Sequence, residues 1–232
     1  MKLELKKYRK ITSLAKRYNF KEFDLITKYG LFSGNQNLFK TLTIFKLIDE
    51  VKKVKGDIIE LGIFQGNTSL LIKKILDIFK IKKKLYLLDH FKGLKHFQKE
   101  DDNYSVRSYK KWTSKDLVSP KNLVKKFLDF FNFKNVFFFN KDATTLDKNY
   151  FKKYKFSLAY FDMDLYEPTL KGLIAIDNSI AKGGIIVFDE GHKKFWQGEK
   201  KAIKDFLKIN KNYKYKLIDK RYQPDVVLKK IK

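Results

Sequence analysis

Acidic residues and glycines follow the short apolar segments of this 232-residue chain, where each predicted strand ends. They are Glu60 and Gly62, Asp89, Asp142, Asp162 with Asp164, and Asp189 with Glu190. In a parallel sheet covered on both faces, the carboxyl ends of the strands meet in one crevice. Converging carboxylates repel one another unless a cation or a hydroxylated ligand lies between them. The pattern therefore predicts one polar site assembled from several strand ends.

The first of these strand ends reads Glu60-Leu-Gly62-Ile-Phe-Gln-Gly66-Asn-Thr68. Two glycines allow a tight turn and a close approach of the backbone to a ligand, and the next helix would point its first amides into the same space. The spacing is neither G-x-G-x-x-G nor a phosphate-binding loop, which disfavours a nicotinamide or flavin cofactor. Asp89, 27 residues after Gly62, is placed to accept hydrogen bonds from ribose hydroxyls, although an acid that caps a turn is the alternative.

The acids at the last two strand ends, Asp162 with Asp164 and Asp189 with Glu190, can supply oxygen ligands to a hard divalent cation. The three histidines share no metal-ligand spacing. His192 could serve as a base or a substrate contact, with a hydrogen-bonded structural role as the alternative.

Strands and helices alternate from residue 57 onward, which indicates parallel βαβ units. The predicted strands are 57–62, 84–89, 135–140, 157–162 and 185–189, and the predicted helices are 67–79, 120–131, 168–181 (closed by Gly183-Gly184) and 199–209. Two further strands, 213–219 and 225–231, would form a hairpin. We therefore predict an α/β fold with a doubly wound, mostly parallel seven-stranded sheet and an antiparallel edge strand.

Two segments outside this alternation could cover the site. Helices predicted over 1–18 and 37–54 would make residues 1–54 an N-terminal helical cap or lid, or a dimer interface, before a main domain over 55–232. The segment 93–119 lacks periodicity and is predicted to be a long functional loop.

The net charge of +26 would suit a polyanionic partner, but lysine dominates it and arginine, the usual reader of phosphates and bases, is scarce. A lysine-rich solvated surface explains the charge without nucleic acid. Lysines interrupt every apolar stretch long enough to span a membrane, and no apolar segment follows the charged amino terminus. With no cysteine there is no disulfide or thiolate site. We expect a cytoplasmic protein.

Four motifs together resemble the macrocin O-methyltransferase family. They are Glu60-Leu-Gly-x-x-x-Gly66, Leu88-Asp89-His-Phe91-x-Gly93-Leu94, Asp162-x-Asp164-Leu-Tyr-Glu-x-Thr169 and Gly183-Gly-x-x-x-x-Asp189-Glu190. The resemblance runs from about residue 28 to the end. It implies a class I, Rossmann-like methyltransferase that uses S-adenosylmethionine (SAM) and Mg²⁺ to methylate a sugar hydroxyl on a glycoside. A nucleotide-sugar or a polysaccharide precursor is a further candidate acceptor, because a cationic surface would favour an anionic carrier.

The resemblance also implies roles for individual residues. Asp162, Asp189 and Glu190 would hold the metal, although the family usually has Asp at the last position. Asp164 would be the general base, with His192 as a further catalytic candidate. The cofactor would contact Glu60, Gly62, Gly66, Thr68, Asp89, His90, Asp142 and Asp162. The alternatives are a metal-dependent catechol or phenol methyltransferase and a nucleic-acid-modifying protein; a homo-oligomer is compatible with all of these.

Overall fold

The structure is a computed structural model that describes residues 13, 16–17, 37–95, 97–101, 121–192 and 196–232. Contacts within the chain separate it into two units, residues 1–42 and residues 43–232, and the second unit contains the whole sheet. Nearly all of the predicted helix over 1–18 and most of the predicted loop over 93–119 lie outside the described residues. The division at residue 54 into a cap and a main domain stays a prediction.

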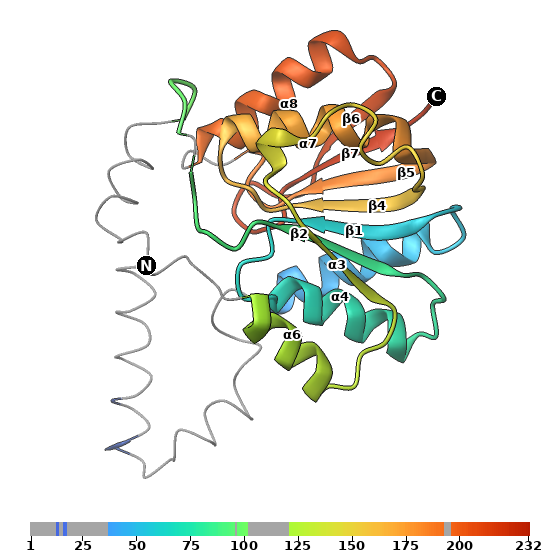
Figure 1. The fold of residues 1–232 in the computed structure, drawn as a ribbon, viewed down its shortest axis with the longest axis vertical. Helices are drawn as coiled ribbons and strands as arrows, with labels where there is room; N and C mark the ends of the chain where they lie inside the picture. Colours follow the sequence, from blue (N-terminus) through green and yellow to red (C-terminus); the bar gives the residue numbers. More distant parts are fainter. Residues whose placement is uncertain (1–12, 14–15, 18–36, 96, 102–120, 193–195) are drawn as a thin grey trace. The chain divides into compact units, whose positions relative to one another are not determined.

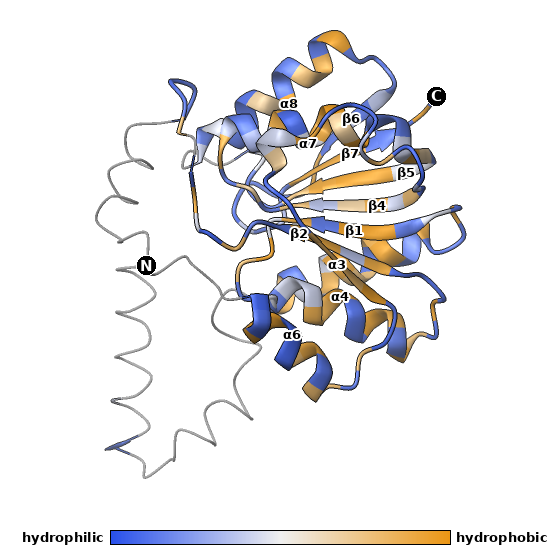
Figure 2. Ribbon diagram, in the orientation of Figure 1, coloured by the Kyte–Doolittle hydropathy of each residue, from blue (hydrophilic) through white to orange (hydrophobic). Residues whose placement is uncertain are grey.

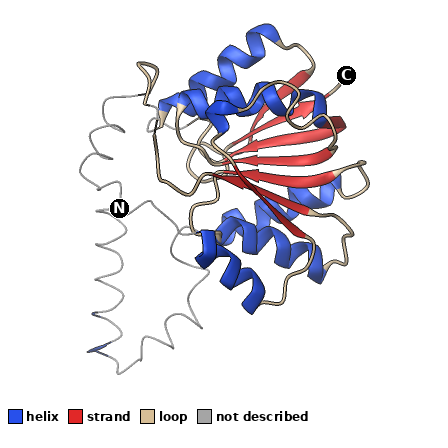
Figure 3. Cartoon of the chain, in the orientation of Figure 1, coloured by secondary structure: helices blue, strands red, loops and turns tan. Residues whose placement is uncertain are grey.

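Seven strands form one sheet in the order β3-β2-β1-β4-β5-β7-β6 (Figures 1 and 3). Their bounds are β1 Asp57–Leu61, β2 Leu85–Asp89, β3 Val136–Asn140, β4 Phe156–Phe161, β5 Ile180–Phe188, β6 Tyr213–Leu217 and β7 Val226–Lys230. Strands β1 to β5 are parallel, whereas β7 runs antiparallel to both β5 and β6. The predicted doubly wound, mostly parallel seven-stranded sheet is confirmed, and the C-terminal hairpin forms its antiparallel end.

Helices cover both faces of this sheet (Figure 1). The helices are α3 Leu38–Val51, α4 Asn67–Ile78, α6 Lys121–Phe130, α7 Tyr166–Ile176 and α8 Gln197–Ile209. Helices α4 and α6, with α3 from residue 43 on, pack on the face that carries Ile58, and α7 and α8 pack on the opposite face, which carries Ile59 and Leu61. The two cores follow from the alternation of side chains along a strand, and Figure 2 shows the strands as mostly hydrophobic between more polar helices.

One boundary differs from the sequence prediction. Gly183 and Gly184 do not close the helix after β4, since they lie inside β5, which begins at Ile180. Ile180 and Ala181 are buried and extend the strand at its amino end, and Gly184 lies so close to Ser157 that a Cβ there would be 3.0 Å from the Ser157 carbonyl oxygen. In the part of the chain that the structure describes, no helix combines the length and the apolar character needed to cross a membrane.

Candidate active site

The ends of the parallel strands lie side by side, as the alternation predicted. Leu61, the last residue of β1, pairs with Leu88 of β2 and with Phe161 of β4, and Phe161 pairs with Phe188 of β5. The residues that leave these strands therefore start from one edge of the sheet, which we call the carboxyl edge. It carries a glycine loop after β1 and acidic residues after β4 and β5.

The glycine loop after β1 lies against the backbone that leaves β4. Gly62 has φ +85°, and a Cβ at this position would lie 1.9 Å from the carbonyl oxygen of Asp162. The amide of Gly62 donates to the Leu88 carbonyl at 3.0 Å, and the amide of Asp162 donates to the Leu61 carbonyl at 2.9 Å. Gly66, with φ +80°, ends the loop as the N-cap residue of α4. This geometry leaves no room for a side chain between the loop and the acidic segment.

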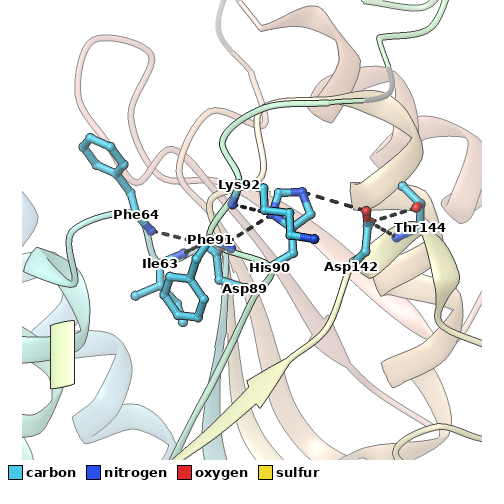
Figure 4. A network of polar contacts seen from close by, with 8 residues as sticks. All are labelled: Ile63, Phe64, Asp89, His90, Phe91, Lys92, Asp142 and Thr144. Carbon is cyan, nitrogen blue, oxygen red and sulfur yellow. Dashed lines mark hydrogen bonds and ion pairs between the residues drawn. The ribbon is translucent and has the colours of Figure 1, made fainter. Parts of the chain in front are cut away.

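Asp89 holds the glycine loop through backbone amides (Figure 4). Its Oδ2 accepts from Ile63 at 2.8 Å and from Phe64 at 3.2 Å, and its Oδ1 accepts from Phe91 at 2.6 Å. Burial raises the pKa of Asp89, but hydrogen bonds from His90 and from these amides outweigh it, so the pKa lies below its ordinary value. A carboxylate at this position is therefore ionised and fixed at neutral pH.

His90 lies between two of the predicted cofactor residues (Figure 4). Its Nδ1 is 3.6 Å from Asp89 Oδ1, and its Nε2 is 3.9 Å from Asp142 Oδ2. Asp142 also accepts from the Thr144 amide at 3.0 Å and from the Thr144 hydroxyl at 2.8 Å. The structure thus brings Asp89, His90 and Asp142 together beside the glycine loop.

Glu60 and Thr68 lie beneath the loop. Glu60 is buried and accepts from the Ser69 hydroxyl at 2.5 Å, which ties the end of β1 to the first turn of α4. Thr68 is buried in the same turn. Their position supports the loop from inside, and a direct contact of either residue with a cofactor stays a prediction.

Five carboxyl groups gather beside the loop, and we call them the acidic cluster: Asp162, Asp164, Asp189, Glu190 and Glu199. Burial raises the pKa of Glu190 well above its ordinary value, and the negative charges of Asp164, Asp189, Asp162 and Glu199 raise it further. Asp189 is buried and accepts from the Tyr160 hydroxyl. The predicted metal ligands therefore interact electrostatically as one group.

Glu199 belongs to this cluster, although its position in the sequence did not predict this. It lies in the first turn of α8, where an acid ordinarily reflects the helix dipole. Its side chain is fully buried, and its Oε2 accepts from the Glu190 amide at 2.8 Å. Burial raises its pKa well above the ordinary value, and the charges of Asp162 and Asp164 add to this. Glu199 thus fixes the backbone of the predicted metal ligand Glu190.

Two carboxylate oxygens of the cluster bear on whether a cation fits there. Glu190 Oε2 and Glu199 Oε1 are buried and have no hydrogen-bond partner among the described residues. Such oxygens are costly unless a proton or a cation satisfies them, and an all-oxygen donor set suits a hard divalent ion. In the arrangement that the described residues adopt, no three His, Asp or Glu side chains form a ready group of metal ligands. The donor chemistry fits Mg²⁺, and binding it would require these side chains to move closer together.

The loop after β5 is anchored by the segment that precedes β7. The His192 amide donates to both oxygens of buried Asp225 at 3.2 and 3.1 Å, and Gln223 donates from Nε2 to Glu190 Oε1. These contacts hold the backbone beside Glu190. A catalytic role for the His192 side chain stays a prediction.

Comparison with solved structures places this fold among methyltransferases. CalS11, the calicheamicin methyltransferase, superposes with a TM-score of 0.74 at 21% identity over 97% of this chain and 92% of that one. The O-methyltransferase NovP superposes with a TM-score of 0.70 at 16% identity, over 84% of this chain and 81% of that one. An O-methyltransferase from Bacillus cereus in complex with SAH (S-adenosylhomocysteine) superposes with a TM-score of 0.54 at 10% identity, over 90% of this chain and 88% of that one. These likenesses establish the fold.

The family follows from the sequence itself. The macrocin-O-methyltransferase (TylF) family matches residues 32–220, which is most of the chain. The chain therefore belongs to this family and is a methyltransferase, as its motifs predicted. A comparison with curated proteins finds no match.

Proposed function

We propose that this chain transfers a methyl group from SAM to a hydroxyl group of a sugar, with a divalent cation held at the acidic cluster. The observation that carries the proposal is the backbone contact between Gly62 and Asp162. It places a cofactor-type glycine loop directly beside a group of carboxylates. Methyl transfer to an alcohol needs both parts, because the donor must be positioned and the acceptor must lose a proton.

The glycine loop and its neighbours would hold the donor. The amides at the start of α4 and the ionised Asp89 suit a ligand with ribose hydroxyls, and His90 with Asp142 would line the adjoining space. A bound SAM supplies a methyl group on a positively charged sulfur, which is already activated for attack. The protein's task is to align this group with the acceptor oxygen.

Asp162, Asp189 and Glu190 would hold the cation, and Glu199 would keep the Glu190 backbone in place. The unsatisfied oxygens and the mutual repulsion within the cluster support this assignment. A bound Mg²⁺ would supply positive charge that lowers the pKa of the acceptor hydroxyl.

Asp164 would take the proton. It follows β4 by three residues and adopts φ +62°, a backbone conformation that is uncommon outside glycine and is often found at functional sites. In the transfer the methyl carbon leaves sulfur and bonds to the acceptor oxygen, and the hydroxyl proton passes to the Asp164 carboxylate. The sulfonium becomes a neutral thioether, so charge and atoms balance.

The acceptor is proposed from the family and from one related structure. The apo structure of CalS11 is described as a TDP-rhamnose 3'-O-methyltransferase, and it resembles this chain with a TM-score of 0.65 at 20% identity. We therefore place a nucleotide-linked sugar first among acceptors for this chain, followed by glycosides and polysaccharide precursors. A cytoplasmic location and a homo-oligomer stay predictions from the sequence.

Calorimetry with SAM and transfer of a labelled methyl group to panels of sugars and phenols would test the proposal. We expect SAM to bind with or without chelator, and turnover to require both a sugar acceptor and Mg²⁺. Asp189→Asn should lose Mg²⁺ binding and turnover while keeping SAM binding. Asp129→Asn, at an exposed position of α6, is the matched control. Turnover in excess chelator would contradict the metal role, and methylation of phenols alone would contradict the sugar acceptor.

A further inference from the structure

A concavity of about 650 Å³ lies at the opposite edge of the sheet, where β1 and β2 begin and the chain enters β4. Three segments line it, 52–57, 81–86 and 153–155. Asp57 and Leu61 are the first and last residues of β1. At about 3.3 Å per residue, the strand separates this concavity from the carboxyl edge by about 13 Å. It is therefore distinct from the candidate active site.

The lining is unusually rich in lysine, and we call it the lysine basin. Seven of its thirteen residues are lysines. Lysine makes up about one residue in five of the chain, so composition alone would place about three there. Asp57 is the one acid in the lining, and its Oδ1 already accepts from the Lys84 amide at 2.9 Å.

Three of the lysines are available to a ligand. Lys55, Lys82 and Lys153 are exposed and make no hydrogen bond or ion pair within the described parts of the chain. They come from three different segments, so only the fold brings them to one concavity. Like charges around a hollow repel one another, and an anion between them would relieve that repulsion.

Lys83 links two of the segments that line the basin. Its Nζ donates to the carbonyls of Val54 at 2.7 Å and Gly56 at 2.6 Å, which links the loop before β1 to the start of β2. Burial lowers the pKa of Lys83, and nearby Asp57 partly offsets this. The three available lysines therefore surround a region that one internal lysine holds in place.

The chemistry of the lining favours phosphate groups. Lysine is a compact point charge that binds phosphate without the planar matching that arginine provides. Tyr86 and Tyr154 add phenol groups, but their rings pack edge to face at 5.3 Å, and the Tyr154 ring stacks on Phe156. With their rings engaged in this way, neither tyrosine offers a free face on which a base could stack.

We propose that the lysine basin binds a di- or triphosphate group, carried by a nucleotide or as the inorganic ion. The site is independent of the methyl-transfer function proposed above, because it shares no residue with the carboxyl edge. A bound phosphate chain would bridge the three lysine-bearing segments and stabilise the amino ends of β1, β2 and β4.

Calorimetry at fixed ionic strength tests this with the full chain, using inorganic tripolyphosphate, pyrophosphate, ATP and adenosine as probes. The triple variant Lys55→Gln, Lys82→Gln, Lys153→Gln should lower the affinity for tripolyphosphate at least about tenfold. The control triple variant Lys125→Gln, Lys171→Gln, Lys204→Gln removes the same charge from exposed positions on α6, α7 and α8. It should change the affinity less than about twofold, since only distant charge is lost.

The probes separate the sources of the phosphate chain. Similar binding of tripolyphosphate and ATP, with none of adenosine, supports recognition of the phosphates. Equal losses in both triple variants would overturn the proposal in favour of bulk charge attraction, and so would the absence of saturable binding by any phosphate probe. Binding of ATP without tripolyphosphate would also overturn it. SAH affinity and melting temperature without ligand should be the same in both triple variants.

Discussion

The two edges of the sheet concentrate opposite charges in different ways. At the carboxyl edge, five carboxyl groups gather. Two of them, Asp189 and Glu199, are buried, and they accept internal hydrogen bonds from the Tyr160 hydroxyl and from the Glu190 amide. At the opposite edge, where β1 and β2 begin and which we call the amino edge, seven lysines surround a concavity. Three of them are exposed without partners among the described residues. Burial, rather than the number of charges, distinguishes the two edges. It raises the pKa of Glu190 and Glu199 at the carboxyl edge, whereas Lys55, Lys82 and Lys153 at the other edge are exposed. A charged cluster that is buried and internally supported indicates chemistry, whereas an exposed one indicates binding.

The largest effect is expected from removing the proposed base at the carboxyl edge. Asp164→Asn keeps the size of the side chain and tolerates the positive φ, since asparagine adopts this conformation readily. Turnover should fall by about 10²- to 10⁴-fold, the usual contribution of a positioned base. Steady-state kinetics with the best sugar acceptor measures it, and SAH affinity should be nearly unchanged. A variant with normal turnover would show that Asp164 is not the base.

A smaller effect is expected from Asp89→Asn. The amides of Ile63, Phe64 and Phe91 donate to the Asp89 carboxylate, and the variant removes its negative charge. The glycine loop is therefore held less firmly. SAH affinity should fall by about 10- to 100-fold, because charge-assisted hydrogen bonds are about twice as strong as neutral ones. Calorimetry measures this, and Asp57→Asn at the start of β1 is the counterpart at the other edge. Equal losses in the two variants would mean that Asp89 has no special part in cofactor binding.

Glu199→Gln tests what burial does to the acidic cluster. The folded-state pKa of Glu199 lies well above the ordinary value of 4.5, so the folded protein binds this proton more tightly than the unfolded chain does. The stability that the group contributes is full below about pH 4.5 and is lost as pH rises through the folded pKa. The glutamine keeps an oxygen for the Glu190 amide but carries no charge. In the absence of metal, it should therefore raise the melting temperature near pH 8 and leave it unchanged near pH 4.5.

The control for this measurement is Asp129→Asn, at an exposed position of α6, which should shift neither end of the pH profile. Mg²⁺ should stabilise the wild type more than Glu199→Gln, because the cation relieves the same repulsion. A glutamine variant that is less stable than the wild type at pH 8 would contradict the idea that Glu199 is held at an electrostatic cost.

The smallest effect is expected at the amino edge, from two neighbouring lysines. Lys83→Met removes the donor to the Val54 and Gly56 carbonyls and should cost about 1–2 kcal/mol in the free energy of unfolding. Lys82→Met, at an exposed position without a partner among the described residues, should change it by less than about 0.5 kcal/mol. Urea unfolding compares them, and equal effects would mean that Lys83 is no more structural than its neighbour.

The sequence was most informative where the fold is repetitive. Alternating strands and helices predicted the sheet, and acids at strand ends predicted which residues share its carboxyl edge, because parallel strands bring their ends together. Gly183 and Gly184 were misplaced, since glycine punctuates helices and also permits close approach inside a strand such as β5. The burial of Glu199 and the grouping of lysines in the basin could not be predicted from the sequence for another reason. Their environments come from segments distant in sequence, and local spacing carries no information about such contacts.

The contact between Gly62 and the Asp162 backbone has a consequence for anyone who would re-engineer this scaffold. The turn after β1 and the turn after β4 meet at a contact that is too close for even a methyl substituent on Gly62. A loop grafted from a relative would collide with the Asp162 carbonyl oxygen wherever it places a residue other than glycine at position 62. Exchanges of specificity should therefore transplant both turns as a matched pair.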